Sequence, residues 1–225
     1  MRKIALLAVV AFAAACGSSS DPAPTGPSVT GTIGTAAFTS ASQLAMTASG
    51  DGCTLPTLAP GVQLGVSLAL VNVADVAGTC ADAQTCLSNS RNLQLVIAKV
   101  HVPSTAFPSV AAPPFTPGTY QYFDINNPGA PTIDTSGNLA IFTGGVEALG
   151  AAPTCSTTAG YGISSGTLTI STVSGSTLTG NVTVNLINTL GQAAGTLTGT
   201  FSTATNCTPS PAPSACDLLA GIVGM

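Results

Sequence analysis

Three carboxylates and two tyrosines near the middle of the chain have side chains suited to chemistry on a sugar. Asp124, Asp134 and Glu147 lie around one turn and two expected strands, where two of them could converge as the acid and base of a glycosidase. Tyr120 and Tyr122 share one face of a strand and are weak candidates for stacking on a ligand, while a core pair explains the same spacing more simply. Turn chemistry and solubility explain the carboxylates with fewer assumptions, so we predict no catalytic residue.

Two further patterns suggest catalysis or metal binding and are weak. Residues 162–166, Gly-Ile-Ser-Ser-Gly, match the G-x-S-x-G turn of serine hydrolases, but here the segment opens a strand with no helix after it. The single histidine, His101, also lies upstream of this serine, whereas that fold needs it downstream. Asp124 with Asn126 and Asn127 makes only a weak calcium candidate. We predict neither a metal nor a cofactor.

The cysteines indicate disulfides. Apart from Cys16 the chain has six, an even number that predicts up to three bridges in an exported protein. The spacing favours Cys80 paired with Cys86, while Cys207 and Cys216 either pair with each other or reach back to Cys53 and Cys155. A zinc site would need a second matching cysteine pair or more histidine. The six disulfide candidates are Cys53, Cys80, Cys86, Cys155, Cys207 and Cys216.

Charge is scarce. The 225 residues include 4 Lys and Arg and 8 Asp and Glu, whereas about a quarter of an ordinary soluble domain is charged. The lack of a basic face excludes nucleic acid as a partner, and the lack of Glu, Lys and Arg argues against a helix bundle. A mean hydropathy of +0.50 argues against intrinsic disorder. Lys99 and His101, on one side of a strand end, are expected to face solvent.

The N-terminus predicts export. Arg2 and Lys3 precede an apolar run at 4–15 that ends in small residues. The run is shorter than the roughly 20 residues a membrane-spanning helix needs, so residues 1–15 have the layout of a signal peptide. Residues 16–28, rich in Gly, Ser and Pro, then predict a flexible tether.

Cys16 follows Ala13-Ala14-Ala15, and this placement resembles the lipobox of bacterial lipoproteins. The resemblance implies that cleavage leaves Cys16 as the first residue and that acyl chains on it anchor the protein in a membrane, as two or three chains do stably. Gly17, in place of Asp, implies transport to the outer membrane. The alternative is an ordinary secretory signal with an incidental cysteine.

Residues 29–225 predict one all-β domain. Residues 62–70 alternate apolar and polar side chains, and 166–201 hold three alternating strands joined by Gly and Ser turns, which is typical of an antiparallel meander. Residues 92–102 are apolar on both faces in the middle of the segment, as in a central strand. We predict an antiparallel β-sandwich or flattened barrel of about eight to ten strands, with little helix. Further strands are expected at 29–39, 42–48, 118–125 and 138–147, and helices only at 74–88 and 217–223.

A proline-dense stretch, residues 103–117, interrupts this pattern. Its five prolines forbid a regular helix or central strand. We interpret it as a long loop that either binds a partner or separates two half-sheets.

The mature chain as a whole resembles a group of Ala/Thr/Gly-rich bacterial lipoproteins of uncharacterised activity. The resemblance rests on Cys16 with its tether, on the Gly-Thr-Leu-Thr phrases within 165–180 and 195–201, and on the closing Cys207…Cys216 segment. It implies no activity and assigns no functional residue.

These observations predict a membrane-anchored envelope lipoprotein acting as a structural or binding module, without catalytic activity. A glycan or an envelope protein is the expected partner, and the Thr/Ser/Asn-covered sheet faces and the loop at 103–117 are the expected surfaces. The alternative is a carbohydrate-active or other hydrolytic enzyme that uses Asp124, Asp134 and Glu147.

Overall fold

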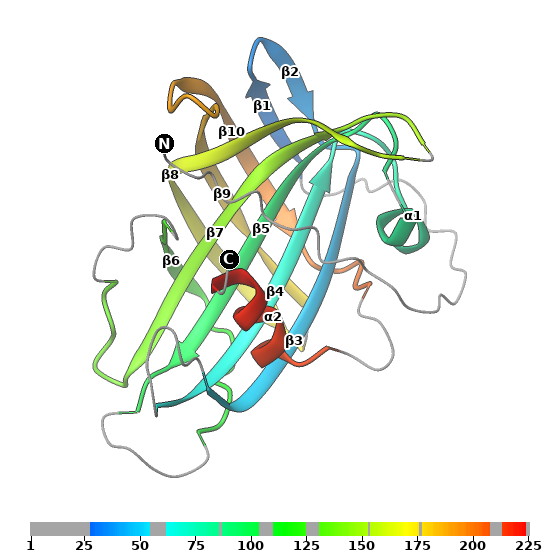
Figure 1. The fold of residues 1–225 in the computed structure, drawn as a ribbon. Helices are drawn as coiled ribbons and strands as arrows, with labels where there is room; N and C mark the ends of the chain where they lie inside the picture. Colours follow the sequence, from blue (N-terminus) through cyan, green and yellow to red (C-terminus); the bar gives the residue numbers. More distant parts are fainter. Residues whose placement is uncertain are drawn as a thin grey trace.

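A computed structural model of the chain describes residues 28–54, 62–85, 87–103, 110–124, 131–152, 154–175, 177–207 and 213–223 (Figure 1). The predicted signal peptide, most of the tether, Cys16 and Cys86 lie outside the described residues.

Ten strands form one sheet, and two short helices complete the described elements (Figure 1). The sheet order is β2-β1-β10-β9-β8-β6-β7-β5-β4-β3, and β8 also pairs with β7. Neighbouring strands are antiparallel except for β6 and β7. The prediction of an all-β fold with a C-terminal strand series and little helix is therefore confirmed. The bounds are β1 (Val29–Ile33), β2 (Ala36–Thr39), β3 (Ser42–Thr54), β4 (Gln63–Ala74), α1 (Cys80–Thr85), β5 (Arg91–His101), β6 (Gly118–Tyr122), β7 (Asn138–Leu149), β8 (Thr157–Ser174), β9 (Thr177–Ile187), β10 (Ala193–Ser202) and α2 (Ala215–Val223).

The sheet curls into a half-barrel, so that its inner face supplies both walls of one core. Alternate residues point inward along each strand. Leu93, Leu95 and Ile97 of β5 belong to the same buried cluster as Leu168 of β8 and Val184 of β9. Of the two predicted architectures, the curled single sheet corresponds to the flattened barrel.

The outer face of β3, β4 and β5 is also buried, because α2 lies across it (Figure 1). Val96, Ala98 and Val100, the outward residues of β5, share a second cluster with Leu218 and Leu219 of α2. Burial on both faces explains why the middle of β5, residues 95–98, is apolar on both sides of the sheet, as expected for a central strand.

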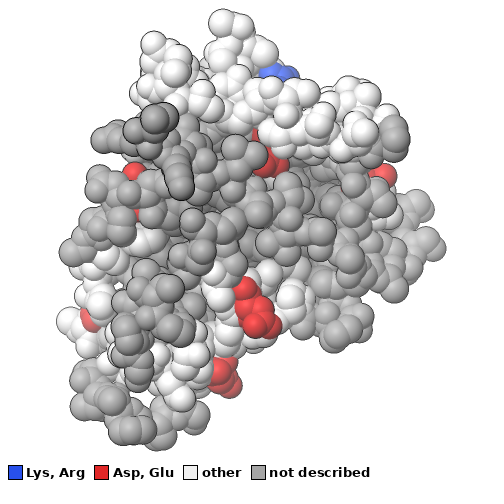
Figure 2. Space-filling view, viewed as in Figure 1, with Lys and Arg blue, Asp and Glu red and all other residues white. Residues whose placement is uncertain are grey.

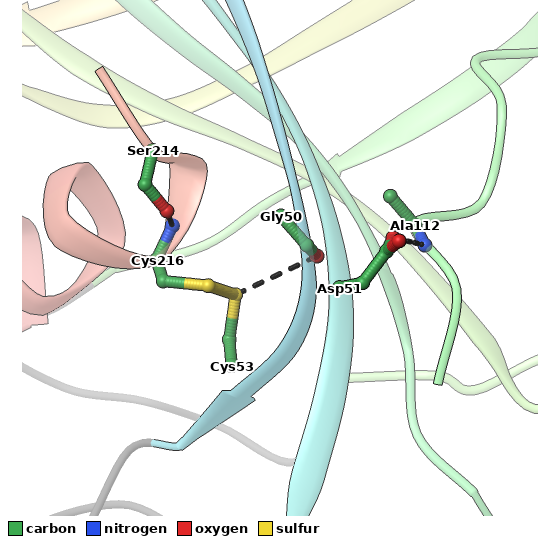
Figure 3. Close-up of a disulfide and its surroundings, with 6 residues drawn as sticks. All are labelled: Gly50, Asp51, Cys53, Ala112, Ser214 and Cys216. Atoms are coloured by element: carbon green, nitrogen blue, oxygen red, sulfur yellow. Dashed lines mark hydrogen bonds between the residues drawn. A yellow bond between two sulfur atoms is a disulfide. The ribbon is translucent and has the colours of Figure 1, made fainter. Parts of the chain in front are cut away.

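A disulfide between Cys53 on β3 and Cys216 on α2 holds the helix in this position (Figure 3). The two cysteines are 163 residues apart in sequence, and their Cα atoms are 5.1 Å apart. Ser214 caps the helix, because its Oγ accepts a hydrogen bond of 3.1 Å from the Cys216 backbone N–H. A Cβ at Gly50 would lie 2.7 Å from Cys216 Sγ, so the close approach of helix and strand requires glycine there.

The second described disulfide joins Cys80 to Cys207, and the predicted pair of Cys80 with Cys86 is therefore wrong. The reason lies in the tertiary structure. The chain after β10 turns back along β3, where Asn206 forms a β-bridge with Ala45. This path places Cys207 beside Cys80 at the start of α1. Cys155 is disulfide-bonded as well. These bridges indicate folding in a non-cytosolic, oxidising compartment.

Residues 110–117 of the proline-rich stretch pack against the inner face at one end of β4 and β5. Ser67 Oγ donates a hydrogen bond of 2.8 Å to the Pro113 carbonyl. Lys99 Nζ donates one of 2.8 Å to Thr116 Oγ1. This segment therefore closes one end of the core, while residues 104–109 of the predicted loop lie outside the described residues.

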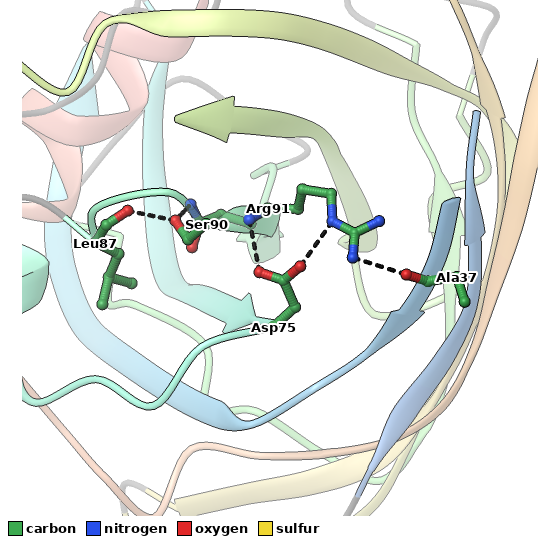
Figure 4. Close-up of polar contacts among 6 residues, drawn as sticks. Ala37, Asp75, Leu87, Ser90 and Arg91 are labelled. Carbon is green, nitrogen blue, oxygen red and sulfur yellow. Dashed lines mark hydrogen bonds and ion pairs between the residues drawn. The ribbon is translucent and has the colours of Figure 1, made fainter. Parts of the chain in front are cut away.

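Basic side chains occupy both ends of the inner face of β5. Arg91, at one end, forms a 2.7 Å ion pair with Asp75 and donates a hydrogen bond to the Ala37 carbonyl of β2 (Figure 4). Its guanidinium also lies 5.9 Å from the centre of the Phe38 ring. Lys99, at the other end, is only 8% exposed, so the expectation that it faces solvent is wrong. Its inward alternation with the apolar residues of β5 buries it under the 110–117 segment.

Gln43 joins β3, at the edge of the sheet, to the end of β10. Its side chain acts as a substitute for a paired strand, because Nε2 donates to the Thr200 carbonyl at 3.1 Å and Oε1 accepts from the Ser202 N–H at 2.8 Å. The backbone continues this closure, since the Cys207 N–H donates to the Ala45 carbonyl. Gln43 is 8% exposed, and its two bonds to β10 are partly shielded from water.

Replacing Gln43 with alanine should lower the free energy of unfolding by about 1–2 kcal/mol, because it removes two part-buried hydrogen bonds to the backbone of β10. Urea unfolding followed by circular dichroism measures the loss. The matched control is Gln63→Ala, at an exposed strand position, which should change stability by less than about 0.5 kcal/mol. Equal effects of the two substitutions would show that the Gln43 bonds do not hold the curl.

Candidate functional site

The carboxylates considered for catalysis do not gather at one place. Asn138 and Glu147 lie near opposite ends of β7, about 30 Å apart at the usual rise per residue in a strand, and Asp134 lies just before Asn138. Asp134 Oδ1 accepts hydrogen bonds of 2.8 Å from the N–H groups of Asn138 and Ser136. These bonds, that from Asn138 foremost, lower the pKa of Asp134. Asp134 therefore has the role of a turn residue, and it forms no acid–base pair with Glu147.

Glu147 is a partly buried carboxylate with a raised pKa. Burial raises it, while a 3.3 Å hydrogen bond from Gln94 Nε2 to its Oε2 opposes the shift. It points outward from β7 opposite Asn92, whose Oδ1 is buried without a hydrogen-bond partner. Asp124 follows β6, where its charge contributes to raising the pKa of Tyr122.

The two tyrosines pack against the core of the half-barrel. Tyr120 is 2% exposed, its ring centre lies 6.4 Å from that of Phe115, and its hydroxyl donates to the Thr116 carbonyl. Tyr122 is half-buried, with its ring 5.7 Å from Phe142 and its hydroxyl donating to a β8 carbonyl. The Tyr120 ring is therefore enclosed by the protein, as the core-pair interpretation predicts.

Other candidates from the sequence are placed as follows. Ser164 is exposed within β8 and donates a hydrogen bond to the Asn185 carbonyl of β9, so it does not occupy a strand-to-helix turn. Within the described ranges, no group of three or more His, Cys, Asp or Glu side chains is arranged to hold a metal ion. His101 Nδ1 lies 3.0 Å from Asn138 Oδ1, at the same end of the core as Lys99. No helix in the described part of the chain is long and apolar enough to span a membrane.

The most regular polar feature is a set of threonines on the outward face of β2, β1, β10, β9 and β8. Residues directly opposite each other on paired strands point to the same side of a sheet. The strand register therefore aligns one threonine from each of the five strands in a single row. In sheet order, the row consists of Thr39, Thr30, Thr198, Thr183 and Thr167.

Two parallel rows flank this one, and we call all three together the hydroxyl face. They lie one step of two residues away on either side, at about 6.6–6.8 Å along the strands, while neighbouring strands are about 4.7–4.9 Å apart. One row consists of Thr196, Asn185 and Ser165, and the other of Thr200, Asn181, Thr169 and Thr119.

Side-chain hydrogen bonds connect residues within the rows. Thr183 Oγ1 and Thr198 Oγ1 are 2.8 Å apart. Asn185 joins its row, because its Oδ1 accepts from Thr196 Oγ1 at 2.9 Å and its Nδ2 donates to Ser165 Oγ at 3.0 Å. Threonine is also stiff about χ1 because it is β-branched. The hydroxyl face is therefore an ordered array of donors and acceptors.

No charged residue occurs in the sequence between Glu147 and Asp217, a stretch that contains all of β8, β9 and β10. The charges lie elsewhere in the sequence, and in the view of Figure 2 small separate acidic areas and a small basic area are visible between white residues and residues that are not described. Sheet faces covered by threonine could be predicted from the sequence, but the alignment of threonines from five strands in one row could not. The recurring Gly-Thr-Leu-Thr phrases were the signal, and the register that aligns them was missing.

Titration of Tyr122 tests the environment of the tyrosine pair. Burial raises its pKa from 10.0 to about 12, so folding favours the neutral phenol. The stability from this group is complete below about pH 10 and is lost as the pH rises through about 12. Phenolate absorbance of the folded chain should continue to rise up to about pH 12, and Tyr122→Phe should remove part of that late signal. Complete ionisation near pH 10 would contradict this placement.

No protein-family model, no curated protein and no solved structure matches the chain. Among the described residues, the hydroxyl face is the most regular polar surface that a function has to explain.

Proposed function

We propose that the chain is a lipid-anchored protein of the bacterial envelope whose β domain is a structural or binding module without catalytic activity. The observation that carries the proposal is the pair of long-range disulfides, Cys53–Cys216 and Cys80–Cys207. They require an oxidising compartment, which agrees with the export predicted from residues 1–15.

The anchor in this proposal is Cys16. Its position after Ala13-Ala14-Ala15 resembles a lipobox, and residues 16–28 have the composition of a tether long enough to hold the domain away from the membrane surface. Gly17 supports an outer-membrane destination within the same proposal.

A binding role is favoured over an enzymatic one by the arrangement of polar groups. Asp134 and Glu147 lie near opposite ends of β7, whereas the hydroxyl face presents many equivalent groups on paired strands. Equivalent, repeated groups suit recognition of a surface or polymer better than attack on a single bond.

Intact mass of the chain extracted from its native membrane tests the proposal. We expect a chain that begins at Cys16 and carries acyl mass, with no thiol alkylated before reduction and the other six cysteines alkylated after it. The control is Cys16→Ser, which should lose the acyl mass and keep the disulfides. A soluble chain with free thiols would contradict both the predicted export and anchoring and the disulfide-linked fold.

A further inference from the structure

The hydroxyl face lacks what most classes of macromolecule need. Nucleic acids and anionic membranes require basic residues, and the strands of this face have none. Protein interfaces are enriched in aromatic residues, Met and Arg, and the rows contain only Thr, Asn and Ser. Among the described residues, the large exposed hydrophobic side chains are Ile133 and Leu190, and neither lies on these strands.

What the face offers is a repeated set of neutral hydrogen-bonding groups. Each hydroxyl both donates and accepts, and each asparagine amide adds two donors and an acceptor. Thr39, Thr30, Thr198 and Thr167 are exposed and Thr183 is half-exposed. A partner that matches this chemistry is itself neutral and rich in hydroxyl groups.

The geometry of the central row suits a polymer. Its five threonines lie on five adjacent strands at intervals of about 4.7–4.9 Å. That interval is comparable to the length of one sugar ring, so an extended polysaccharide lying across the strands would meet a hydroxyl at each ring. The threonine methyl groups would contact the apolar C–H faces of the sugars.

Order in the array reduces the entropic cost of binding. The Thr183–Thr198 contact and the Thr196–Asn185–Ser165 chain hold these side chains in place before a ligand arrives. Pre-organised groups lose less conformational freedom on association. The strands beneath are equally constrained, since their inward residues, such as Leu168, Val184 and Leu197, are fully buried.

We infer that the hydroxyl face is a binding site for a neutral polysaccharide, with the chain running across β2, β1, β10, β9 and β8 along the central threonine row. The inference deepens the proposed binding role and rests on it. It does not depend on the acyl anchor.

Affinity electrophoresis of the full chain tests this, with dextran, laminarin or hydroxyethylcellulose in the gel and polygalacturonate as the charged comparison. We expect retardation by at least one neutral polymer and not by polygalacturonate. The triple variant Thr167→Val, Thr183→Val and Thr198→Val keeps the β-branched shape and removes the hydroxyl groups, so it should bind at least about tenfold more weakly.

Two controls make the result specific. The same three positions changed to serine keep the hydroxyl groups and should retain binding within about threefold. Thr54→Val, at an exposed strand position outside the face, should leave binding unchanged. Circular dichroism of each variant checks that it is folded.

Three results would overturn the inference: no retardation by any neutral polymer, undiminished binding by the folded valine triple variant, or preference for the charged polymer. A result that refutes the lipid anchor at Cys16 is distinguishable from a result that refutes the polysaccharide site. A chain without acyl mass that still binds a neutral polymer would refute the lipid anchor and leave the site intact, and an acylated chain that binds none would do the opposite.

Discussion

Burial of β4 and β5 on both faces is the constraint on which the rest of the structure depends. The middle of β5, residues 95–98, is apolar on both sides of the sheet, so neither face can be left in water at acceptable cost. The inner face is covered because the sheet curls onto itself, and the outer face because α2 lies over it. The Cys53–Cys216 disulfide keeps this short helix at the sheet, and in the chain-entropy description closing so long a loop stabilises the fold by several kcal/mol.

The few charges support this arrangement. Arg91 and Lys99 lie on the inner face of β5 at the two ends of its apolar stretch, where Asp75 and Thr116 respectively give them partners. The core is therefore closed at one end by an ion pair that reaches the β1–β2 hairpin and at the other by the 110–117 segment. Charge is concentrated on the β3–β7 half of the sheet, and the β8–β10 half is left neutral.

Local patterns predicted most of the strands, because alternation is a local property. The central position of β5 and the turn role of Asp134 could be predicted for the same reason. Features that depend on pairing between distant segments could not be predicted from local patterns. Cys80 meets Cys207 only because the chain after β10 returns along β3, and Thr30 joins the threonine row only because β1 pairs with β10. Lys99 is buried by a segment whose prolines indicated only a loop.

The two halves of the sheet therefore differ in role. The β3–β7 half is closed by the helix α2, a disulfide and an ion pair, and the β8–β10 half presents an ordered neutral surface. Threonine-methyl NMR of the chain titrated with a neutral polysaccharide tests this division most directly. We expect shift changes at Thr30, Thr183 and Thr198, and none at Thr54 on β3. Changes centred on Thr54 or on Thr116 beside Lys99, with the central row unaffected, would contradict it.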